Sequence, residues 1–550
     1  MTSLSSTVWW QTGVIYQIYP RSFKDTTDNG VGDLRGVIQK LDYLSDTLGV
    51  DAIWLSPFYP SPMADFGYDV ADYTDVDPLF GDLATFDELV DGAHASDLRI
   101  IIDLVPNHSS DQHPWFRESR SSHENPKRDW YIWADPKPDG SPPNNWLSVF
   151  GGSAWEWEEL TRQYYLHSFL KEQPDLNWRN PEVQEAMFDV ACFWLERGVD
   201  GFRVDVAHYI MKDPQLRDNP PAPGGAKSIH RPLGDYDSQF HIHDRGHPDV
   251  HDVYRGFRQV LDNYSDERPQ VSIGEIHIFD WNEWASYYGE NLDELHMPFN
   301  FALLNIEWEA GEVREVADSL EAALPEGAWP NYVLGNHDES RLASRYGRDE
   351  ARVAAMLLLT LRGTPTLYYG DEIGMTDVPV PPNRRQDPWR IEGSMEMGRD
   401  PCRTPMQWSA APNAGFSPPG TAELWLPLSR DFEIVNVERQ LAEPRSVLNL
   451  YRRLLAYRKA TPALQRGSYR ALDDASNEVP EACYAFLRET EEEHVLVALN
   501  FSDQEQHLVL PSVEEAVVVL STHLDRSGTG DPRSLSLRGN EGLIVELTRS

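Results

Sequence analysis

The sequence predicts an α/β protein built on a (β/α)8 TIM barrel, with a subdomain inserted after the third strand and an antiparallel β-sandwich at the C-terminal end. Short β-type runs recur eight times, and most of them are preceded by a helical pattern, which is typical of parallel βαβ units that close into a barrel. After residue 468 short strands follow one another without helices, which predicts the sandwich.

Eight apolar runs mark the predicted barrel strands. They span residues 14–19, 52–56, 100–105, 199–205, 271–275, 295–299, 332–336 and 366–369, and a helical pattern over 34–48 follows the first. The helix before the fourth strand has clear end signals. Asn180 can cap it, Pro181 fits its first turn, and Gly198 can supply a left-handed stop.

Uneven spacing between these strands predicts the domain organisation. The gap after the third strand is about three times the roughly thirty residues that a βα unit needs, so residues 108–176 are predicted to form an inserted subdomain. Residues 1–107 and 177–468 then form the barrel, and a second excess over 213–252 predicts an extended loop on the same barrel face. The C-terminal sandwich is predicted over 469–550, with strands at 482–487, 495–500, 506–510, 516–520 and 543–547.

Composition and charge exclude several classes of partner. The 550 residues include 89 acidic and 48 basic side chains, and the net charge of -41 would repel a nucleic-acid backbone and an anionic membrane surface. The 3 cysteines predict no disulfide framework or zinc site. No leader-like segment precedes Trp9, and no run approaches the ~18 apolar residues of a membrane span. We therefore expect a cytoplasmic protein without nucleic-acid or membrane partners, whose oligomeric state is open.

Arg203 and Asp205 lie two residues apart near the end of the predicted fourth strand. Side chains at this spacing point to the same side of a strand. Burying both costs several kcal/mol unless each is paired or used. A structural ion pair and a functional site both fit this stretch on its own.

Three acids follow predicted strand ends, where the chemistry of a (β/α)8 barrel is found. They are Asp205, Glu275 and Asp338. Glu275 follows a mostly apolar run, which favours its protonated form and suits a general acid, whereas Asp205 beside an arginine should stay ionised and suit a nucleophile. Two carboxyls with such different environments are typical of glycoside hydrolysis. A metal site built from the same acids is the alternative, but the nearby histidines lack a metal-ligand spacing such as HxxxH.

A series of motifs in order resembles the α-amylase family of glycoside hydrolases, within it the α-glucosidase and oligo-1,6-glucosidase branch. The resemblance covers nearly the whole chain and is specific as a set. The motifs are residues 13–23 (GVIYQIYPRSF), 103–108 (DLVPNH), 173–178 (QPDLNW), 201–205 (GFRVD), Glu275, 336–338 (NHD), 363–372 (GTPTLYYGDE) and 403–408 (RTPMQW).

The resemblance implies a retaining, exo-acting α-glucosidase that releases α-glucose from the non-reducing end of short α-glucosides such as maltose, isomaltose or sucrose. Asp205 would be the nucleophile, Glu275 the acid and base, and Asp338 the group that holds sugar hydroxyls and stabilises the transition state. A transglucosylase or a sucrose or trehalose isomerase on the same scaffold is the alternative, because the covalent intermediate is identical. A non-enzymatic transporter heavy chain would need a membrane anchor and would tolerate loss of these acids.

The resemblance also implies a pocket for the terminal glucose. Its residues would be Asp65, Tyr68, His108, Phe169, Arg203, His337 and Arg399. An Asp65–Arg399 pair would close the back of this pocket and fits exo cleavage, although a plain loop salt bridge is also consistent with the two residues. Val206, directly after the nucleophile, resembles the branch that accepts α-1,6 linkages. The loops around 213–252 and 379–398 would decide between water and a sugar as acceptor.

We expect that the reaction needs no cofactor, and we predict one structural Ca²⁺ or Mg²⁺ ion away from the reaction itself. A partial calcium-loop spacing would use Asp25, Thr27, Asn29, Asp33 and the carbonyl of Val31. The bidentate Glu of such loops is missing, so a hydrogen-bonded turn without an ion fits as well. The lysine-histidine pair that amylases carry after the nucleophile is His208-Tyr209 here, and we therefore expect no calcium near the inserted subdomain.

Overall fold

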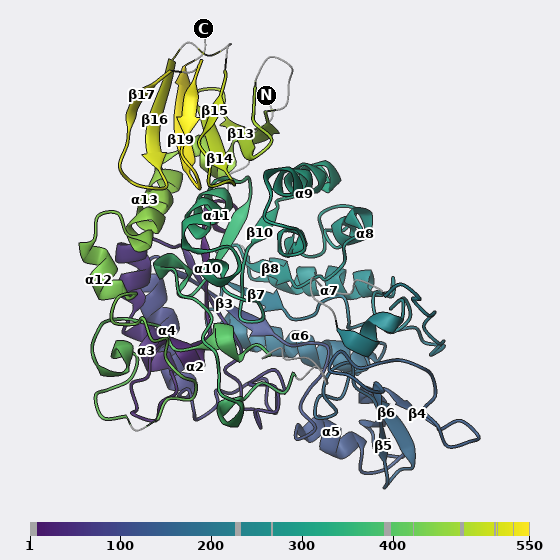
Figure 1. Cartoon of the computed structure of the whole chain (residues 1–550). Coiled ribbons are helices and arrows are strands. Elements are labelled where there is room, and N and C mark those ends of the chain that lie inside the picture. Colours follow the sequence, from purple (N-terminus) through teal and green to yellow (C-terminus); the bar gives the residue numbers. More distant parts are fainter. Residues whose placement is uncertain are drawn as a thin grey trace.

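Eight parallel strands form one sheet in the order β10-β11-β1-β2-β3-β7-β8-β9 in the computed structural model. Figure 1 labels β3, β7, β8 and β10 of this sheet. The structure describes residues 8–225, 233–265, 268–389, 398–421, 423–472, 478–510, 513, 515–531 and 533–548. The barrel strands are β1 (Ile15–Ile18), β2 (Ala52–Leu55), β3 (Arg99–Leu104), β7 (Gly201–Val204), β8 (Val271–Gly274), β9 (Met297–Pro298), β10 (Asn331–Val333) and β11 (Thr364–Tyr368). Each overlaps one predicted strand, so the barrel prediction is confirmed. β9 and β10 lie at the two ends of the order, which leaves the barrel nearly closed.

Helices connect the strands and cover the barrel. They are α1 (Trp9–Thr12), α2 (Pro20–Phe23), α3 (Leu34–Ile38), α4 (Leu83–Ala95), α6 (Pro181–Glu196), α7 (Val250–Asn263), α8 (Trp281–Ser286), α9 (Ala310–Ala323), α10 (Leu342–Arg345), α11 (Arg348–Thr360), α12 (Val437–Ala442), α13 (Val447–Ala460) and α14 (Pro462–Arg466). α6 forms as predicted, because Asn180 accepts a hydrogen bond from the backbone of Glu182 and Gly198 adopts a φ of 92° after the helix.

The predicted helix over 34–48 is broken in the structure. α3 ends at Ile38, and a π-helix, η1 (Tyr43–Leu48), follows after a turn. Gly49 then adopts φ 90°, and its N–H donates to the carbonyl of Leu44. No glycine or proline lies between residues 39 and 42, so the usual signals of a helix break are absent from this segment.

The inserted subdomain is small and rich in aromatic residues. It holds α5 (Pro114–Ser119), the 3-10 turn η2 (Arg128–Trp130) and a three-stranded sheet of β4 (Trp133–Ala134), β6 (Gln163–Leu166) and β5 (Trp155–Glu158) in that order. Trp146 and Trp155 stack at 6.0 Å in its own apolar cluster. Figure 1 shows this sheet apart from the barrel, on the side away from the C-terminal strands. We propose residues 108–176 as its boundaries.

The C-terminal strands form a six-stranded antiparallel sheet that faces a two-stranded one. The order is β12-β13-β14-β19-β16-β17, and β15 pairs with β18. Their bounds are β12 (Ser468–Ala471), β13 (Cys483–Glu489), β14 (His494–Asn500), β15 (Gln506–Leu508), β16 (Glu515–Ser521), β17 (Gly528–Gly530), β18 (Leu535–Leu537) and β19 (Gly542–Thr548). The predicted sandwich is confirmed, while β12, β17 and β18 were not predicted. β17 reads Gly-Thr-Gly, a composition that is depleted in strands.

In the six-stranded sheet, β13 and β14 are buried on both faces. Val495 and Val497 of β14 belong to the main core with the barrel, whereas Leu496 and Ala498 belong to a second core with the two-stranded sheet. This alternation follows the period of two of a strand. The C-terminal unit, for which we propose residues 469–550, therefore packs against the barrel through one face.

Short turns of 3-10 helix complete the chain, and the loops after the barrel strands carry most of them. They are η3 (Gly234–Ser238), η4 (Ala302–Leu304), η5 (Asp371–Ile373), η6 (Pro382–Arg384), η7 (Asp400–Arg403) and η8 (Pro412–Gly415). Within the described ranges, no helix is both long and apolar enough to cross a membrane.

Candidate active site

Strand register brings two of the predicted acids to one level of the barrel. Leu104 pairs with Val204, and Val204 pairs with Gly274. Asp205 and Glu275 are the next residues of their strands, and their backbone N–H groups continue the ladder at 2.8 and 2.9 Å to the preceding strand. Both acids therefore leave the carboxyl end of the barrel side by side, where active sites of this fold lie.

One buried guanidinium holds three carboxyl groups. Arg203 donates through Nη1 to Oδ1 of Asp103 and to Oδ1 of Asp205, each at 2.6 Å, and its Nη2 lies 2.7 Å from Oε2 of Glu275. Its side chain is only 1% exposed. The predicted Arg203–Asp205 contact is present, and Arg203 compensates charges that would otherwise repel one another in this site.

The environment of Glu275 differs from the prediction. The sequence predicted apolar neighbours, but hydrogen-bond donors surround the carboxyl: besides Arg203, the N–H of Val206 donates to Oε2 at 2.9 Å and His277 Nε2 lies 3.0 Å from Oε1. Burial raises the pKa of Glu275, but Arg203 and His277 outweigh it and hold the pKa below its usual range. The prediction of an apolar setting was wrong because these donors come from β7, from the residue after Asp205, and from beyond the apolar run.

The pKa of Asp205 shifts in the opposite direction to that of Glu275, so the prediction that Arg203 keeps Asp205 ionised was wrong for the free site. Burial, together with the negative charge of Glu275, raises the pKa of Asp205 well above its ordinary value, although Arg203 counteracts both. Two carboxyls on one guanidinium titrate as a pair, so a proton taken up by this site is shared between Asp205 and Glu275.

Val206 adopts a left-handed backbone conformation next to the pair. Its φ is 35°, a value that is strained for a β-branched residue. This conformation turns the Val206 N–H toward Oε2 of Glu275. Strain of this kind persists where the surrounding structure holds it in place, and it clusters at functional sites.

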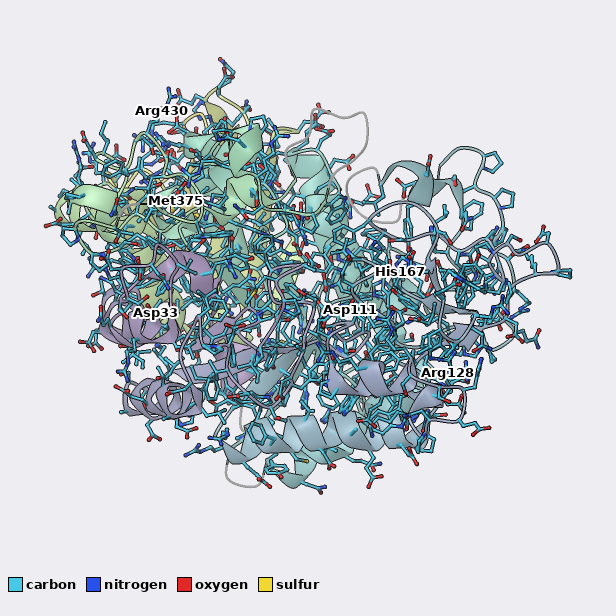
Figure 2. All side chains as sticks on the ribbon, turned by 90° about the horizontal axis from the view of Figure 1, so that it is seen from below. Asp33, Asp111, Arg128, His167, Met375 and Arg430 are labelled. Carbon is cyan, nitrogen blue, oxygen red and sulfur yellow. The ribbon has the colours of Figure 1, made fainter. Side chains whose placement is uncertain are left out.

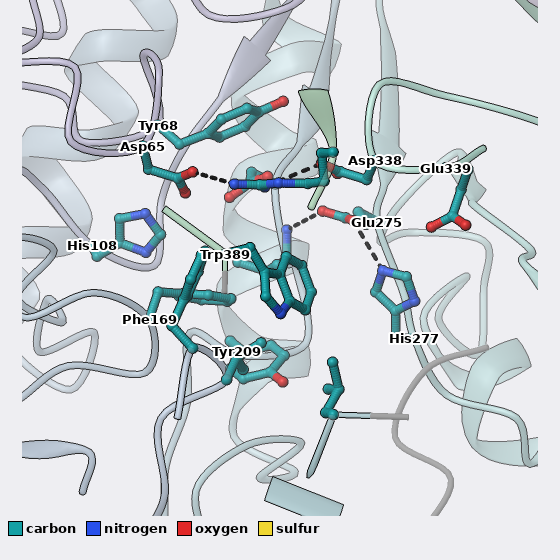
Figure 3. Close-up of a pocket in the computed structure, with 16 residues that line it drawn as sticks. Asp65, Tyr68, His108, Phe169, Tyr209, Glu275, His277, Asp338, Glu339 and Trp389 are labelled. Atoms are coloured by element: carbon teal, nitrogen blue, oxygen red, sulfur yellow. Dashed lines mark hydrogen bonds and ion pairs between the residues drawn. The ribbon is translucent and has the colours of Figure 1, made fainter. Parts of the chain in front are cut away.

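The third acid, Asp338, also lines the cavity and contacts two arginines. Arg403 Nη2 lies 2.7 Å and Arg399 Nη1 lies 3.2 Å from its Oδ1. The Asp338 side chain remains 23% exposed, whereas Asp205 and Glu275 are nearly covered. Asp338 is therefore the most exposed of the three acids, and Figure 3 shows it close to Glu275.

The predicted pair between Asp65 and Arg399 is present. Arg399 Nη2 donates to Oδ1 of Asp65 at 2.6 Å, and both side chains are buried. The same guanidinium donates to Asp387 at 2.8 Å. Arg399 thereby bridges the loop after β2, the loop after β11 and Asp338, and it lines the cavity together with Asp65.

A single cavity collects most of the predicted residues. Its lining includes Asp65, Tyr68, His108, Phe169, Arg399 and the three acids. Arg203 and His337 lie behind this lining and contact it. Gln17 donates to Nδ1 of His337 at 2.7 Å, so Nε2 carries the hydrogen toward the hydroxyl of Tyr68, also at 2.7 Å. Burial lowers the pKa of His108 to about 4 and that of His337 to about 3, which keeps both rings neutral near pH 7.

A cluster of apolar and aromatic side chains forms another part of the cavity lining. Val149, Phe150, Val206, Tyr209, Leu233 and Trp389 line it. The loops expected to choose the acceptor, 213–252 and 379–398, supply Leu233 and Trp389. Residues 226–232 and 390–397 of these loops lie outside the described residues.

The predicted metal loop is held by its own hydrogen bonds. The carboxylate of Asp25 accepts from the backbone N–H groups of Thr27, Asp28 and Gly30 and from the hydroxyl of Ser417. Oδ1 of Asn29 accepts from Val31 N, and Asp33 caps α3. Among the described residues no three His, Cys, Asp or Glu side chains gather into a metal shell. These residues fit a hydrogen-bonded turn, and the Ca²⁺ or Mg²⁺ stays a prediction. Asp33 lies on the opposite side of Figure 2 from Arg128 and His167 of the inserted subdomain.

A lysine joins the barrel to the inserted subdomain. Lys212 Nζ donates to Oδ1 of Asn107 at 2.6 Å and lies 2.7 Å from Oδ2 of Asp175. All three side chains are buried. A cationic amine thus lies between the amide oxygen of Asn107 and the carboxylate of Asp175 at this junction. The absence of calcium near the inserted subdomain stays a prediction.

Four contacts of the site were not predicted from the sequence: His277 on Glu275, Asp387 on Arg399, Arg403 on Asp338, and Lys212 on Asp175. Arg403 lies in the quoted motif at 403–408, so a signal for it existed. Asp387 is one of many acids in an acidic chain and carries no distinguishing signal in the sequence.

Paired carboxyls on one arginine, in a cavity at the carboxyl end of a (β/α)8 barrel, are the arrangement of an enzyme that cleaves glycosidic bonds. Residues 17–467 match the Alpha amylase catalytic domain, and residues 476–524 match the Maltogenic Amylase C-terminal domain. The chain belongs to the alpha-amylase family of glycoside hydrolases.

Individual relatives point to more than one activity within this family. The chain is 45% identical over 515 residues to a probable alpha-glucosidase of Rhizobium meliloti (strain 1021), covering 92% of this chain and 91% of that protein. The solved structure of the alpha-glucosyl transfer enzyme XgtA is 43% identical, with a TM-score of 0.92 over 99% of this chain and 100% of the other. The trehalulose synthase MutB from Pseudomonas mesoacidophila MX-45 is 34% identical, with a TM-score of 0.87 over 99% of this chain and 100% of the other.

Proposed function

We propose that the protein is a retaining, exo-acting α-glucosidase that releases α-glucose from the non-reducing end of short α-glucosides. The observation that carries this proposal is the Asp65–Arg399 contact in the lining of the cavity, and we infer that this contact closes the cavity beyond the acids. A pocket with a closed end admits one terminal sugar and excludes the middle of a long chain. The neutral rings of His108 and His337 and the apolar face of Phe169 suit an uncharged sugar.

The proposed reaction is a double displacement. Asp205 attacks the anomeric carbon while Glu275 gives its proton to the departing oxygen, which forms a glucosyl ester on Asp205 and leaves Glu275 as a carboxylate. Glu275 then takes a proton from water as the water oxygen attacks the same carbon, and the Asp205 carboxylate departs. Asp338, with Arg399 and Arg403 on its other side, holds sugar hydroxyls and stabilises the positive charge of the transition state.

The proton must lie on Glu275 when the first step begins. In the free site the donors around Glu275 favour its ionised form, and burial favours a protonated Asp205. We propose that substrate binding moves the shared proton, because the glycosidic oxygen is an acceptor that only a protonated Glu275 can serve, while the electrophilic carbon favours an ionised Asp205.

Transfer of glucose to a sugar, including sucrose isomerisation, is the second candidate. It uses the same intermediate and differs only in the acceptor. The likeness to XgtA and to the trehalulose synthase MutB supports it. A purely structural role, as in a transporter heavy chain, gains no support from a site in which Asp205, Glu275 and Asp338 are all present and held by arginines.

Product analysis tests the proposal. Proton NMR of early product from maltose, isomaltose, sucrose and trehalose should show α-glucose before mutarotation, and initial β-glucose would rule out retention. Asp205→Asn should lose activity by a factor of about 10³ or more, since it removes the nucleophile. Asp111→Asn, a change of the same kind outside the cavity, should retain it. Disaccharide products without free glucose would favour the transfer reaction instead.

A further inference from the structure

His277 lies two residues after the proposed acid and contacts it directly. Its Nε2 is 3.0 Å from Oε1 of Glu275, and the ring itself lines the cavity (Figure 3). The imidazole stacks on Phe301 with ring centroids 4.3 Å apart and planes 10° from parallel. This stacking holds the ring in place, so the contact with Glu275 does not depend on a mobile side chain.

The two oxygens of Glu275 have different partners. Oε2 receives the guanidinium of Arg203 at 2.7 Å and the N–H of Val206 at 2.9 Å. A proton on Oε2 would meet these two donors, so the acidic proton belongs on Oε1. Oε1 is also the oxygen that His277 contacts, and the imidazole therefore acts on the atom that must protonate the leaving group.

The hydrogen of His277 can be placed from its surroundings. Nδ1 is buried, and no residue in the described part of the chain offers it a hydrogen bond. An imidazolium would leave a buried N–H without an acceptor at Nδ1, which costs more than leaving a lone pair there. The neutral ring with its hydrogen on Nε2 satisfies Glu275, so His277 is a donor to Oε1.

We propose that His277 is a positioning residue for Glu275, which aims Oε1 into the cavity and makes the carboxyl a stronger acid by donating a hydrogen bond to its ionised form. The proposal rests on the assignment of Glu275 as the acid and base. A hydrogen bond to the charged form of an acid lowers its affinity for a proton. His277 therefore assists protonation of the leaving group in the first step and weakens Glu275 as a base in the second.

Other charged and titratable groups face the same pair. Arg203 from β7 and Asp338 after β10 act on Glu275, Asp205 shares its proton, and the ring of His208 lies 6.1 Å from that of His277. These groups remain in place when only His277 is changed. A variant at this position consequently isolates the donor on Oε1.

Two substitutions of His277 separate the effect of its hydrogen-bond donor from the effect of its aromatic ring. His277→Phe keeps a ring on Phe301 and removes the donor, whereas His277→Gln can place an amide N–H near the position of Nε2. In His277→Phe we expect the alkaline limb of the kcat/KM profile, which reports loss of the proton that Glu275 shares with Asp205, to move to higher pH by about one unit or more. In His277→Gln the limb should stay close to that of the wild type. Thermal midpoints and near-UV circular dichroism establish that both variants are folded.

A measurement without turnover completes the test. Carbon-13 NMR of the full chain with labelled glutamate carboxyls, assigned with Glu275→Gln, reads the titration of Glu275 directly. A higher midpoint in His277→Phe than in the wild type supports the proposal. The proposal is overturned if the alkaline limb and the NMR midpoint of His277→Phe coincide with those of the wild type. It is also overturned if His277→Gln behaves like His277→Phe. If the wild type cleaves no α-glucoside, the proposed function fails, and the NMR titration still decides the effect of His277 on Glu275.

Discussion

At the residue scale the site is organised by a few arginines that each hold several acids. Arg203 binds Asp103, Asp205 and Glu275, and Arg399 binds Asp65, Asp338 and Asp387. A planar guanidinium presents donors in fixed directions, so it fixes the relative positions of the carboxyls around it. The acids can therefore lie close together without free repulsion, at positions set by the donor geometry.

Asp387 is predicted to matter through Arg399. Burial raises its pKa, but the guanidinium of Arg399 outweighs burial and lowers the pKa of Asp387 to about 2. Asp387→Asn removes a charged acceptor from Arg399 and loosens the closed wall of the pocket. Because a hydrogen bond to a charged group contributes about 1.5–3 kcal/mol, KM for a disaccharide should rise by about tenfold or more, with a smaller effect on kcat.

The same loop provides the control for this prediction. Asp377 binds Ser340 and the backbone of Arg341, outside the cavity lining. Asp377→Asn should leave KM within about twofold of the wild type, as expected for a substitution away from the site. Equal KM values for Asp387→Asn and the wild type would show that Asp65 and Asp338 alone suffice to hold Arg399.

The sequence predicted contacts between residues that lie in stretches resembling the family. It did not predict contacts that depend only on how the strands and loops are arranged in the fold. The Asp65–Arg399 pair joins residues 334 positions apart, yet both lie in stretches that resemble the family. Glu275 was predicted to have apolar surroundings because the four residues before it are mostly apolar. Its donors are set by strand register and by the left-handed turn of Val206, neither of which is visible in the local sequence.

At the element scale the barrel strands were predictable because they are buried on both faces. All eight read as short apolar runs, which is what a parallel strand covered on both sides requires. The three missed strands of the C-terminal unit are three or four residues long, and β17 consists of Gly-Thr-Gly. Tertiary pairing rather than propensity creates such strands, so the sequence alone does not reveal them.

Lys212 is predicted to stabilise the junction between elements. It connects the loop after β3 at Asn107, the end of the inserted subdomain at Asp175, and the loop after β7. Lys212→Met would leave the carboxylate of Asp175 buried without its cation, which costs about 3–5 kcal/mol. A thermal or urea denaturation series should therefore show a clear loss of stability in this variant.

Two further variants test whether the loss of stability in Lys212→Met comes from the unpaired carboxylate of Asp175. Lys171→Met removes an exposed lysine nearby and should change stability by about 0.5 kcal/mol or less. Adding Asp175→Asn to Lys212→Met should recover part of the loss, because the unpaired charge is then removed. A Lys212→Met protein as stable as Lys171→Met would contradict a role for this lysine in joining the subdomain to the barrel.

At the scale of the whole molecule, the sequence predicted separate units but not how they share a core. The apolar core of the barrel extends into the C-terminal sheet through Val495 and Val497, and the opposite face of that sheet forms its own core. The run from 495 to 499 is apolar at every position. Continuous apolar composition of a strand indicates burial on both faces, but the partner for each face depends on the assembled fold.

The net charge of -41 predicts a molecule that salt stabilises. Even if each of the 48 basic side chains paired with one acid, 41 of the 89 acids would remain without a cationic partner, and like charges destabilise the compact state. The distance over which surface charges act on one another, the Debye length, falls from about 10 Å at 0.1 M salt to about 3 Å at 1 M. The repulsion between surface acids therefore weakens over this range. The thermal midpoint should rise between 0.05 and 1 M NaCl, and KCl at the same ionic strength should have the same effect.

Two other outcomes would contradict this prediction. A midpoint that stays constant or falls would show that screening of favourable ion pairs outweighs relief of repulsion. A rise at millimolar CaCl₂ alone would point to a specific cation site instead.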